Sequence, residues 1–132
     1  MRKILKVLNV IVIILFLIGI CLTEQLLANK YLNEMKEKMT TLNNYFISVD
    51  TLADTKLIND TNAINEFWTK KEEVLCNFVN HKDIEDIGVE LNKMQSAIKN
   101  DDKDAYTESL KLIFFYINSY RHVIGISIQN IF

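Results

Sequence analysis

Residues 28–53 read ANKYLNEMKEKMTTLNNYFISVDTLA, and this stretch decides the fold. Its apolar residues are separated by alternating steps of four and three: Ala28, Leu32, Met35, Met39, Leu42, Phe46, Val49 and Ala53. Most of the positions between them are polar. An average repeat of 3.5 residues is the period of a helix that buries one seam against other helices. The stretch therefore predicts an amphipathic helix that continues to about Thr55.

A strongly apolar run, Ile4 to Leu22, precedes this seam with no helix breaker between them. It holds one charge, Lys6, and one amide, Asn9. Nineteen helical residues at about 1.5 Å each span roughly 28 Å, close to the hydrocarbon thickness of a bilayer. We therefore expect a transmembrane anchor over residues 1–23, anchored in membrane lipid, and a separate domain over residues 24–132.

A cleaved signal sequence is the alternative to an anchor. Cleavage needs small residues at positions −3 and −1 of the cut. The best position here follows Ala28, but Leu26 then occupies position −3. A lipoprotein signal needs a small residue before its cysteine, and Ile20 precedes Cys21. These mismatches favour an uncleaved anchor.

The basic residues predict the orientation of the anchor. Arg2, Lys3 and Lys6 lie at its start, whereas only Lys30 lies within ten residues after it. Basic flanks tend to stay in the cytoplasm. We expect a single-pass protein of the cell membrane, with a cytoplasmic N-terminus and an extracytoplasmic domain.

The composition favours helices and argues against nucleic acid as a partner. The chain has no proline and three glycines, fewer than tight turns and β-hairpins usually need. Beyond the three leading basic residues, twelve of the fifteen basic residues remain against seventeen acidic ones. An acidic domain lacks the basic surface that binds phosphates. Cys21 and Cys76 lie in different regions, so we expect no disulfide between them.

Three further helices are predicted from apolar faces separated by polar, cap-forming residues. The predicted breaks lie at Asn59–Asn62, His81–Asp83 and Asn100–Asp102. The predicted faces are Ile64, Phe67, Trp68, Leu75, Phe78, Val79 and Lys82; then Ile84, Ile87, Leu91, Met94 and Ile98; then Tyr106, Leu110, Ile113, Ile117, Tyr120 and Ile124. Short loops make sequential helices antiparallel. The prediction is an all-α chain whose transmembrane helix continues into an antiparallel bundle of about four helices.

No set of residues in the sequence forms a recognisable catalytic or metal site. His81 and His122 are the only histidines, and His81 is predicted near the end of the second helix, where a cation is favourable. Its nearest carboxylate at helical spacing, Glu85, falls across a predicted break. Cys76 lacks a Cys-x-x-Cys partner and an adjacent histidine.

Two acidic clusters, at residues 83–86 and 101–108, begin predicted helices, and the second lacks the glycine and distal glutamate of a calcium loop. Glycine-rich phosphate loops, nucleophile elbows and zinc-ligand spacings do not occur. The sequence therefore predicts a protein that is not an enzyme and has no cofactor or metal.

The roles of Trp68 and of the C-terminal tail can each be interpreted in two ways. Trp68 is expected in the core because it lies on an apolar face, although a lone tryptophan also suits an exposed partner contact. The end of the chain is rich in apolar residues, whereas free termini are usually polar; they are Ile124, Ile126, Ile128, Ile131 and Phe132. This tail either packs on the bundle as a latch or docks on another molecule. We favour the latch, because a bare apolar tail is costly in water.

The second half of the chain resembles a known family. The resemblance rests on Trp68, Lys71, Leu75, Phe78, His81, Ile84, Ile87, Leu91 and the terminal Asn130-Ile131-Phe132. These positions are similar to those of small Firmicute proteins defined only as a domain of unknown function. The likeness covers most of residues 56–132 and the general plan of the N-terminus. It carries over Trp68, His81, Asn130, Ile131 and Phe132 with no catalytic role. It also implies a multi-spanning membrane partner of the YetF-like type, often encoded beside such proteins.

Together these features predict a membrane-anchored helical interaction or accessory protein of the bacterial cell envelope. The alternative is an extracytoplasmic, sensor-like bundle that binds a small ligand between its helices.

Anchoring can be tested on the intact chain. We expect it to stay in the membrane fraction through an alkaline carbonate wash, because the apolar run is long enough to span the bilayer. A soluble product that starts near Asn29 would instead identify a cleaved signal. Protease added outside intact cells should digest the domain, and full protection would reverse the predicted topology.

Overall fold

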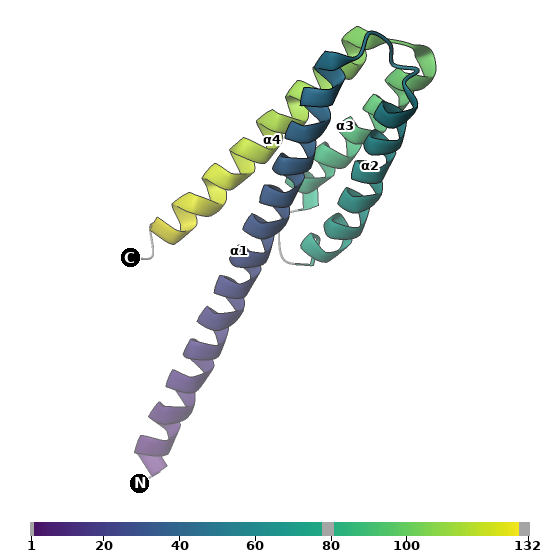
Figure 1. Cartoon of the computed structure of the whole chain (residues 1–132). Coiled ribbons are helices and arrows are strands. Elements are labelled where there is room, and N and C mark those ends of the chain that lie inside the picture. Colours follow the sequence, from purple (N-terminus) through teal and green to yellow (C-terminus); the bar gives the residue numbers. More distant parts are fainter. Residues whose placement is uncertain (1, 78–80, 130–132) are drawn as a thin grey trace.

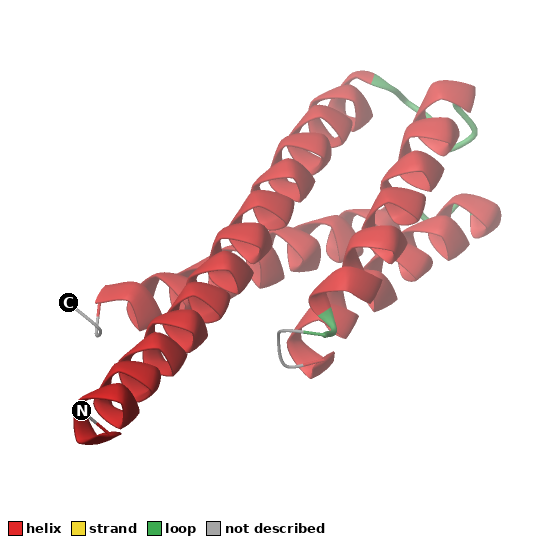
Figure 2. Ribbon diagram, turned by 90° about the horizontal axis from the view of Figure 1, so that it is seen from below, coloured by secondary structure: helices red, strands yellow, loops and turns green. Residues whose placement is uncertain are grey.

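The computed structural model contains four α-helices joined by short connections (Figure 1). They are α1 (Arg2–Ser48), α2 (Thr55–Leu75), α3 (His81–Asn100) and α4 (Lys103–Gln129). The structure describes the backbone of residues 2–77 and 81–129, and the side chains of residues 4–77, 82 and 84–121. Figure 2 shows only helices and loops over this part of the chain.

The helices form a ring in which each contacts its neighbours in sequence. α1 contacts α2, α2 contacts α3, α3 contacts α4, and α4 closes the ring against α1. Within the described residues, the backbones of the diagonal pairs do not approach each other, and α2 and α4 meet only through long side chains in the core. The chain therefore runs up and down, and α4 returns alongside α1 (Figure 1). The predicted all-α antiparallel bundle is confirmed.

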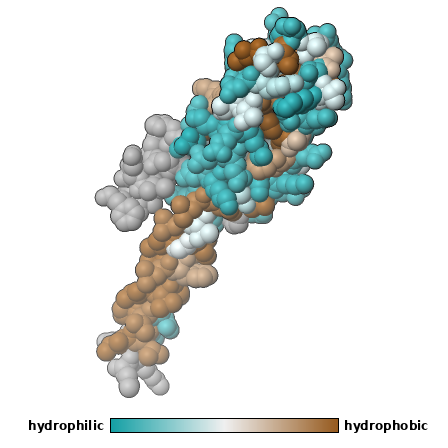
Figure 3. All heavy atoms as spheres, in the orientation of Figure 1, coloured by the Kyte–Doolittle hydropathy of each residue, from teal (hydrophilic) through white to brown (hydrophobic). Residues whose placement is uncertain are grey.

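α1 is a single helix with two different surroundings. All its side chains from Ile4 to Thr23 are exposed, and this segment extends beyond the bundle as an apolar rod (Figure 3). From Ala28 to Phe46 one face is buried, while the intervening positions are partly or fully exposed. α1 is long and apolar enough to cross a membrane. A signal anchor and a signal sequence near the N-terminus would both have this length and composition. The predicted continuity between the apolar run and the seam is confirmed.

The seam is confirmed from Ala28 to Phe46, but its predicted end is wrong. α1 stops at Ser48, so Val49 is only partly buried and Ala53 is exposed. Leu52 is buried in the connection instead.

A cap fixes the start of α2 at Thr55. The carboxylate of Asp54 accepts a hydrogen bond from the Leu57 amide at 2.8 Å and another from the Tyr45 hydroxyl at 3.0 Å. The Leu57 hydrogen bond, with a smaller contribution from Tyr45, keeps the pKa of Asp54 below its ordinary value despite an opposing effect of burial. This cap starts α2 at Thr55 and ties its first turn to the last turns of α1.

The predicted break at Asn59–Asn62 is also wrong, because these residues lie inside α2. The side chains of Asp60 and Thr61 are paired along the helix rather than used as caps. Lys56 and Asp60 form an i,i+4 ion pair at 2.6 Å, and the Thr61 hydroxyl donates to the Leu57 carbonyl at 2.8 Å. Cap-forming residue types therefore mark several possible helix starts in the sequence. The buried Leu57 and its hydrogen bonds to Asp54 and Thr61 select the helix start at Asp54.

A break does separate the second and third helices, but its predicted position at His81–Asp83 is wrong, because these residues form the first turn of α3. α2 ends at Leu75 and α3 begins at His81, so the histidine does not lie at the C-terminal end of a helix. The favourable dipole position predicted for it therefore does not exist. Lys82 is exposed rather than part of a buried face, and Phe78 and Val79 lie outside the described residues.

The faces of α3 and α4 agree with prediction over the described side chains. Ile84, Ile87, Leu91 and Met94 are buried on α3, as are Tyr106, Leu110, Ile113, Ile117 and Tyr120 on α4. Ile98 is partly buried, and the side chain of Ile124 lies outside the described residues.

The turn between α3 and α4 has the predicted cap. Asp101 adopts φ 53°, in the left-handed region that aspartate tolerates better than most residues. The Asp102 amide then donates to the Ala97 carbonyl at 2.9 Å. The Asp102 carboxylate accepts from the Ala105 amide at 3.0 Å, so it caps α4.

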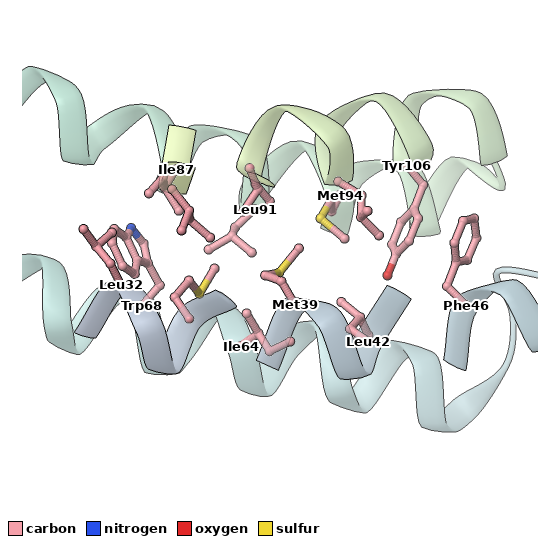
Figure 4. Close-up of a cluster of buried hydrophobic side chains, with 14 of the residues drawn as sticks. Leu32, Met39, Leu42, Phe46, Ile64, Trp68, Ile87, Leu91, Met94 and Tyr106 are labelled. Carbon is pink, nitrogen blue, oxygen red and sulfur yellow. The ribbon is translucent and has the colours of Figure 1, made fainter. Parts of the chain in front are cut away.

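The core runs the length of the bundle. Figure 4 shows Leu32, Trp68 and Ile87 at one end of the cluster, and Phe46 and Tyr106 at the other. The Phe46 and Tyr106 rings lie 4.8 Å apart between centroids and join α1 to α4. Each helix contributes to this cluster, which explains why no helix pair can fold apart from the others without exposing apolar surface.

Two substitutions test the core. We expect Leu91→Ala and Ile113→Ala each to lower the free energy of unfolding by about 2–5 kcal/mol, because each leaves a cavity. Both side chains are 0% exposed. Urea unfolding of the full chain in mild detergent, followed by the fluorescence of the single tryptophan, measures the change. Lys111→Ala, at an exposed position of α4, is the control, and neutrality of both core variants would contradict the packing.

Candidate functional site

The family resemblance carries over five positions, and Trp68 is the one among them whose side chain the structure describes. It comes from α2, is 0% exposed and lies near Leu32 of α1 (Figure 4). Its indole Nε1 is buried and has no hydrogen-bond partner among the residues that the structure describes. The expectation of a core tryptophan is confirmed, and an exposed partner contact at Trp68 is wrong. The side chain of His81 and all of Asn130, Ile131 and Phe132 lie outside the described residues, as does the predicted latch.

The junction between the apolar rod and the bundle is the first feature that suggests a function. A hollow of about 510 Å³ lies against α1 here, lined by Leu15, Phe16, Gly19, Ile20, Thr23, Glu24 and Leu27. A Cβ atom placed on Gly19 would meet no atom of the described residues within 4 Å. This face of α1 is therefore apolar, recessed and open around a glycine, a surface that a lipid chain or another transmembrane helix can approach closely.

Polar contacts hold α1 to both of its neighbours above this junction. The Lys71 ammonium of α2 lies 4.3 Å from the ring centroid of Tyr31 on α1. On the other side, the Lys36 ammonium donates to the Asn118 side-chain oxygen of α4 at 3.2 Å. Lys38 of α1 also lies over the Phe67 ring of α2 at 4.8 Å. Because α1 is fastened on two sides, a displacement of the rod would be transmitted to the bundle.

A polar pair crosses the core far from the junction. The hydroxyl groups of Thr61 on α2 and Tyr106 on α4 lie 2.9 Å apart, and both residues are fully buried. Burial raises the pKa of Tyr106 to about 12, against a lowering effect of the Thr61 hydrogen bond. A phenol held neutral in this way is a structural donor rather than a proton-transfer group at neutral pH.

The remaining sequence candidates whose side chains the structure describes do not assemble into a reactive centre. Burial, with smaller effects of Glu72 and Glu85, raises the pKa of the Cys76 thiol, which makes it a poorer nucleophile. Among the side chains that the structure describes, no three His, Cys, Asp or Glu residues are placed to hold a metal ion. Asp102 of the second acidic cluster serves as a helix cap.

The sequence reasoning missed three buried polar residues, Thr61, Glu90 and Ser109. Thr61 was expected in a loop, and neither Ser109 nor Glu90, which is only 4% exposed, was singled out. A signal for Glu90 does exist, because it stands three residues after Ile87 and four before Met94 and so borders the apolar face of α3. Periodicity alone does not say whether such a border position turns inward.

Residues 26–131 match the family described as a domain of unknown function (DUF4363). The chain belongs to this family. The match begins beyond the apolar run and covers all four helices of the bundle. Comparisons with curated proteins and with solved structures found no match.

The buried Tyr106 makes the stability of this DUF4363 protein sensitive to alkaline pH. The folded chain holds the phenol proton more tightly than the unfolded chain, since the pKa is raised from 10.0 to about 12. The contribution is therefore complete below pH 10.0 and is lost as the pH rises towards about 12. An absorbance titration of tyrosinate should contain a late step that Tyr106→Phe removes. Ionisation of Tyr106 at its ordinary pKa in the folded chain would contradict its burial.

Proposed function

We propose that this protein is a membrane-anchored helical interaction or accessory protein of the bacterial cell envelope, and that it is not an enzyme. The observation that carries the proposal is the construction of α1. One unbroken helix is apolar and exposed on all sides over its first part, then forms the buried seam of the bundle. A helix that is apolar all round suits lipid, and a helix with one apolar face suits a bundle.

The orientation proposed for the anchor rests on charge. Arg2, Lys3 and Lys6 precede or begin the apolar run, which supports a cytoplasmic N-terminus and an extracytoplasmic bundle. The bundle would then stand directly on the outer face of the cell membrane, because α1 continues from the anchor into the bundle without a linker.

The proposed partner is a multi-spanning membrane protein of the YetF-like type, as the family resemblance implies. The recessed face of α1 around Gly19 supports contact within the membrane. In a bilayer, helix association depends on close packing, and small residues permit close approach. The two-sided attachment of α1 to α2 and α4 would pass such a contact on to the bundle.

The test is co-purification with a co-expressed YetF-like protein from membranes. We expect the two chains to form a complex that Gly19→Leu weakens severalfold. The substitution leaves the fold intact because nothing in the described structure lies within 4 Å of the added Cβ.

Leu17→Phe is the matched control, since it adds bulk at an exposed position nearly opposite Gly19 on the same helix. Loss of the complex with both variants would indicate a general defect in insertion. A wild-type chain that is fully membrane-bound but never captures the YetF-like protein would sink the partner proposal and leave the anchor in place.

The second candidate function is the sensor-like bundle that binds a small ligand. One observation favours it: a polar groove between α3 and α4 that contains the buried Glu90.

A further inference from the structure

The last turns of α4 extend past the helix that precedes it. α4 has 27 residues and α3 has 20, and a short turn joins them. Because the two helices are antiparallel, the end of α4 lies beyond the first residue of α3. The residues that extend in this way, 123–129, form the terminal segment of α4. Within the described part of the chain, the backbone of α4 approaches only α3 and α1, so α1 is the one helix left beside this segment.

Two contacts fix the level of the terminal segment along α1. The ring centroids of Phe46 on α1 and Tyr106 on α4 lie 4.8 Å apart, and the Lys36 ammonium donates to the Asn118 side-chain oxygen at 3.2 Å. Each residue of either helix adds about 1.5 Å along its axis. Continued at this register, the end of α4 comes level with residues 23–25 of α1. Figure 1 shows the end of α4 beside the part of α1 that leaves the bundle.

Lipid headgroups surround the proposed anchor at this level. The hydrocarbon layer of a bilayer is about 30 Å thick and the whole bilayer about 40–45 Å, so each headgroup layer is roughly 5–8 Å deep. This depth corresponds to about four or five residues of a helix. Since the apolar run ends at Leu22, the layer covers about residues 23–27 of α1. Leu26 lies in this range and is 67% exposed, so the apolar surface of α1 continues into the headgroup layer.

The terminal segment has a composition that suits lipid. Residues 122–132 contain no Asp, Glu, Lys or Arg. Most residues of the segment are large and apolar: Val123, Ile124, Ile126 and Ile128. Arg121 is exposed shortly before the segment, where a guanidinium can reach lipid phosphates. Apolar residues that follow a basic one are typical of helices that lie at a membrane surface.

Helical spacing shows that α1 cannot cover all of these apolar positions. Ile124 and Ile128 continue the stripe of α4 that is buried in the bundle. Ile126 falls on the opposite face of the helix, two turns after Ser119. That face is exposed at Ser119 and at Phe115, which is 62% exposed. An apolar position on an exposed face, at the level of the headgroups, is better accommodated by lipid than by water.

We propose that the terminal segment of α4 lies in the headgroup layer of the leaflet beneath the bundle, with the face that contains Ile126 against lipid. This inference rests on the proposed membrane anchor and does not depend on the YetF-like partner. A rod alone lets the bundle tilt towards any side, whereas a second contact on the α4 side sets the direction of tilt. The terminal segment would thereby decide which faces of the bundle point away from the membrane.

The competing explanation is a latch, in which the end of α4 packs only on the rest of the protein. Ile124 and Ile128 suit both explanations, because they continue the buried stripe. Ile126 distinguishes between them. A latch leaves the face of Ile126 in water, whereas a membrane contact places it among lipids.

The experiment uses the full chain reconstituted into vesicles of phosphatidylethanolamine and phosphatidylglycerol, with Cys21 and Cys76 replaced by alanine. Ile126→Cys, Ser119→Cys and Ile18→Cys each introduce a single cysteine, which is labelled with the fluorophore NBD. Quenching is measured with lipids that carry a nitroxide either close to the headgroup or near the end of the acyl chain. Ser119→Cys is the matched control, because it lies on the same face of α4 about 10 Å further from the membrane. Ile18→Cys reports on the anchor itself.

We expect the shallow nitroxide to quench the label at Ile126→Cys at least about threefold more than the label at Ser119→Cys, and more than the deep nitroxide does. Val123→Cys, about one turn further from the membrane, should give an intermediate value, so the result does not depend on one labelled position. Quenching at Ile18→Cys without quenching at Ile126→Cys overturns the inference and leaves the anchor in place. Equal quenching at Ile126→Cys and Ser119→Cys also overturns it. Absence of quenching at Ile18→Cys overturns the anchor, and the inference with it.

Discussion

The unbroken backbone of α1 is the constraint on which the rest of the structure depends. One helix continues from a segment whose side chains are exposed and almost all apolar into a segment that buries the seam from Ala28 to Phe46. Because a helix is stiff over this length, the direction of the rod and the direction of the bundle axis are fixed together. α2, α3 and α4 bury the apolar seam of α1. The rod and the first helix of the bundle are therefore one continuous helix, with no linker between them.

The bundle is held by apolar packing along its length, and a few buried polar groups give individual helices a fixed register. Thr61 and Tyr106 set the position of α2 against α4 in the core. Asp54 sets the start of α2 against the end of α1 through Tyr45. Apolar contacts tolerate small sliding movements, whereas a buried hydrogen bond is lost when its partners separate, which is why such pairs specify one arrangement.

Three buried polar atoms do not follow this pattern, because they have no hydrogen-bond partner among the described residues: Oε1 of Gln25, Nε1 of Trp68 and Oε2 of Glu90. The indole N–H of Trp68 is a neutral donor enclosed by the core, and its missing partner is a modest cost of a large buried ring. The Oε2 atom belongs to a carboxylate whose other oxygen is paired with Lys93. A charge costs more to bury than a dipole, so the unpaired oxygen of Glu90 is the more costly of these two.

The sequence by itself determined the helical class, the apolar rod and nearly every buried position on the four faces. These properties depend on the local period of apolar residues, which follows from helix geometry alone. It also located the α3–α4 turn, because Asp101 and Asp102 directly precede the next apolar face. The tertiary structure decided which of two polar segments became the α1–α2 connection. Asp54 and Asn59–Asn62 offer similar capping chemistry, and the choice was made by burial of Leu52, Leu57 and Thr61 against helices distant in sequence. It alone also turned Glu90 inward, since a position at the border of a helical face is buried or exposed according to the neighbour that packs there.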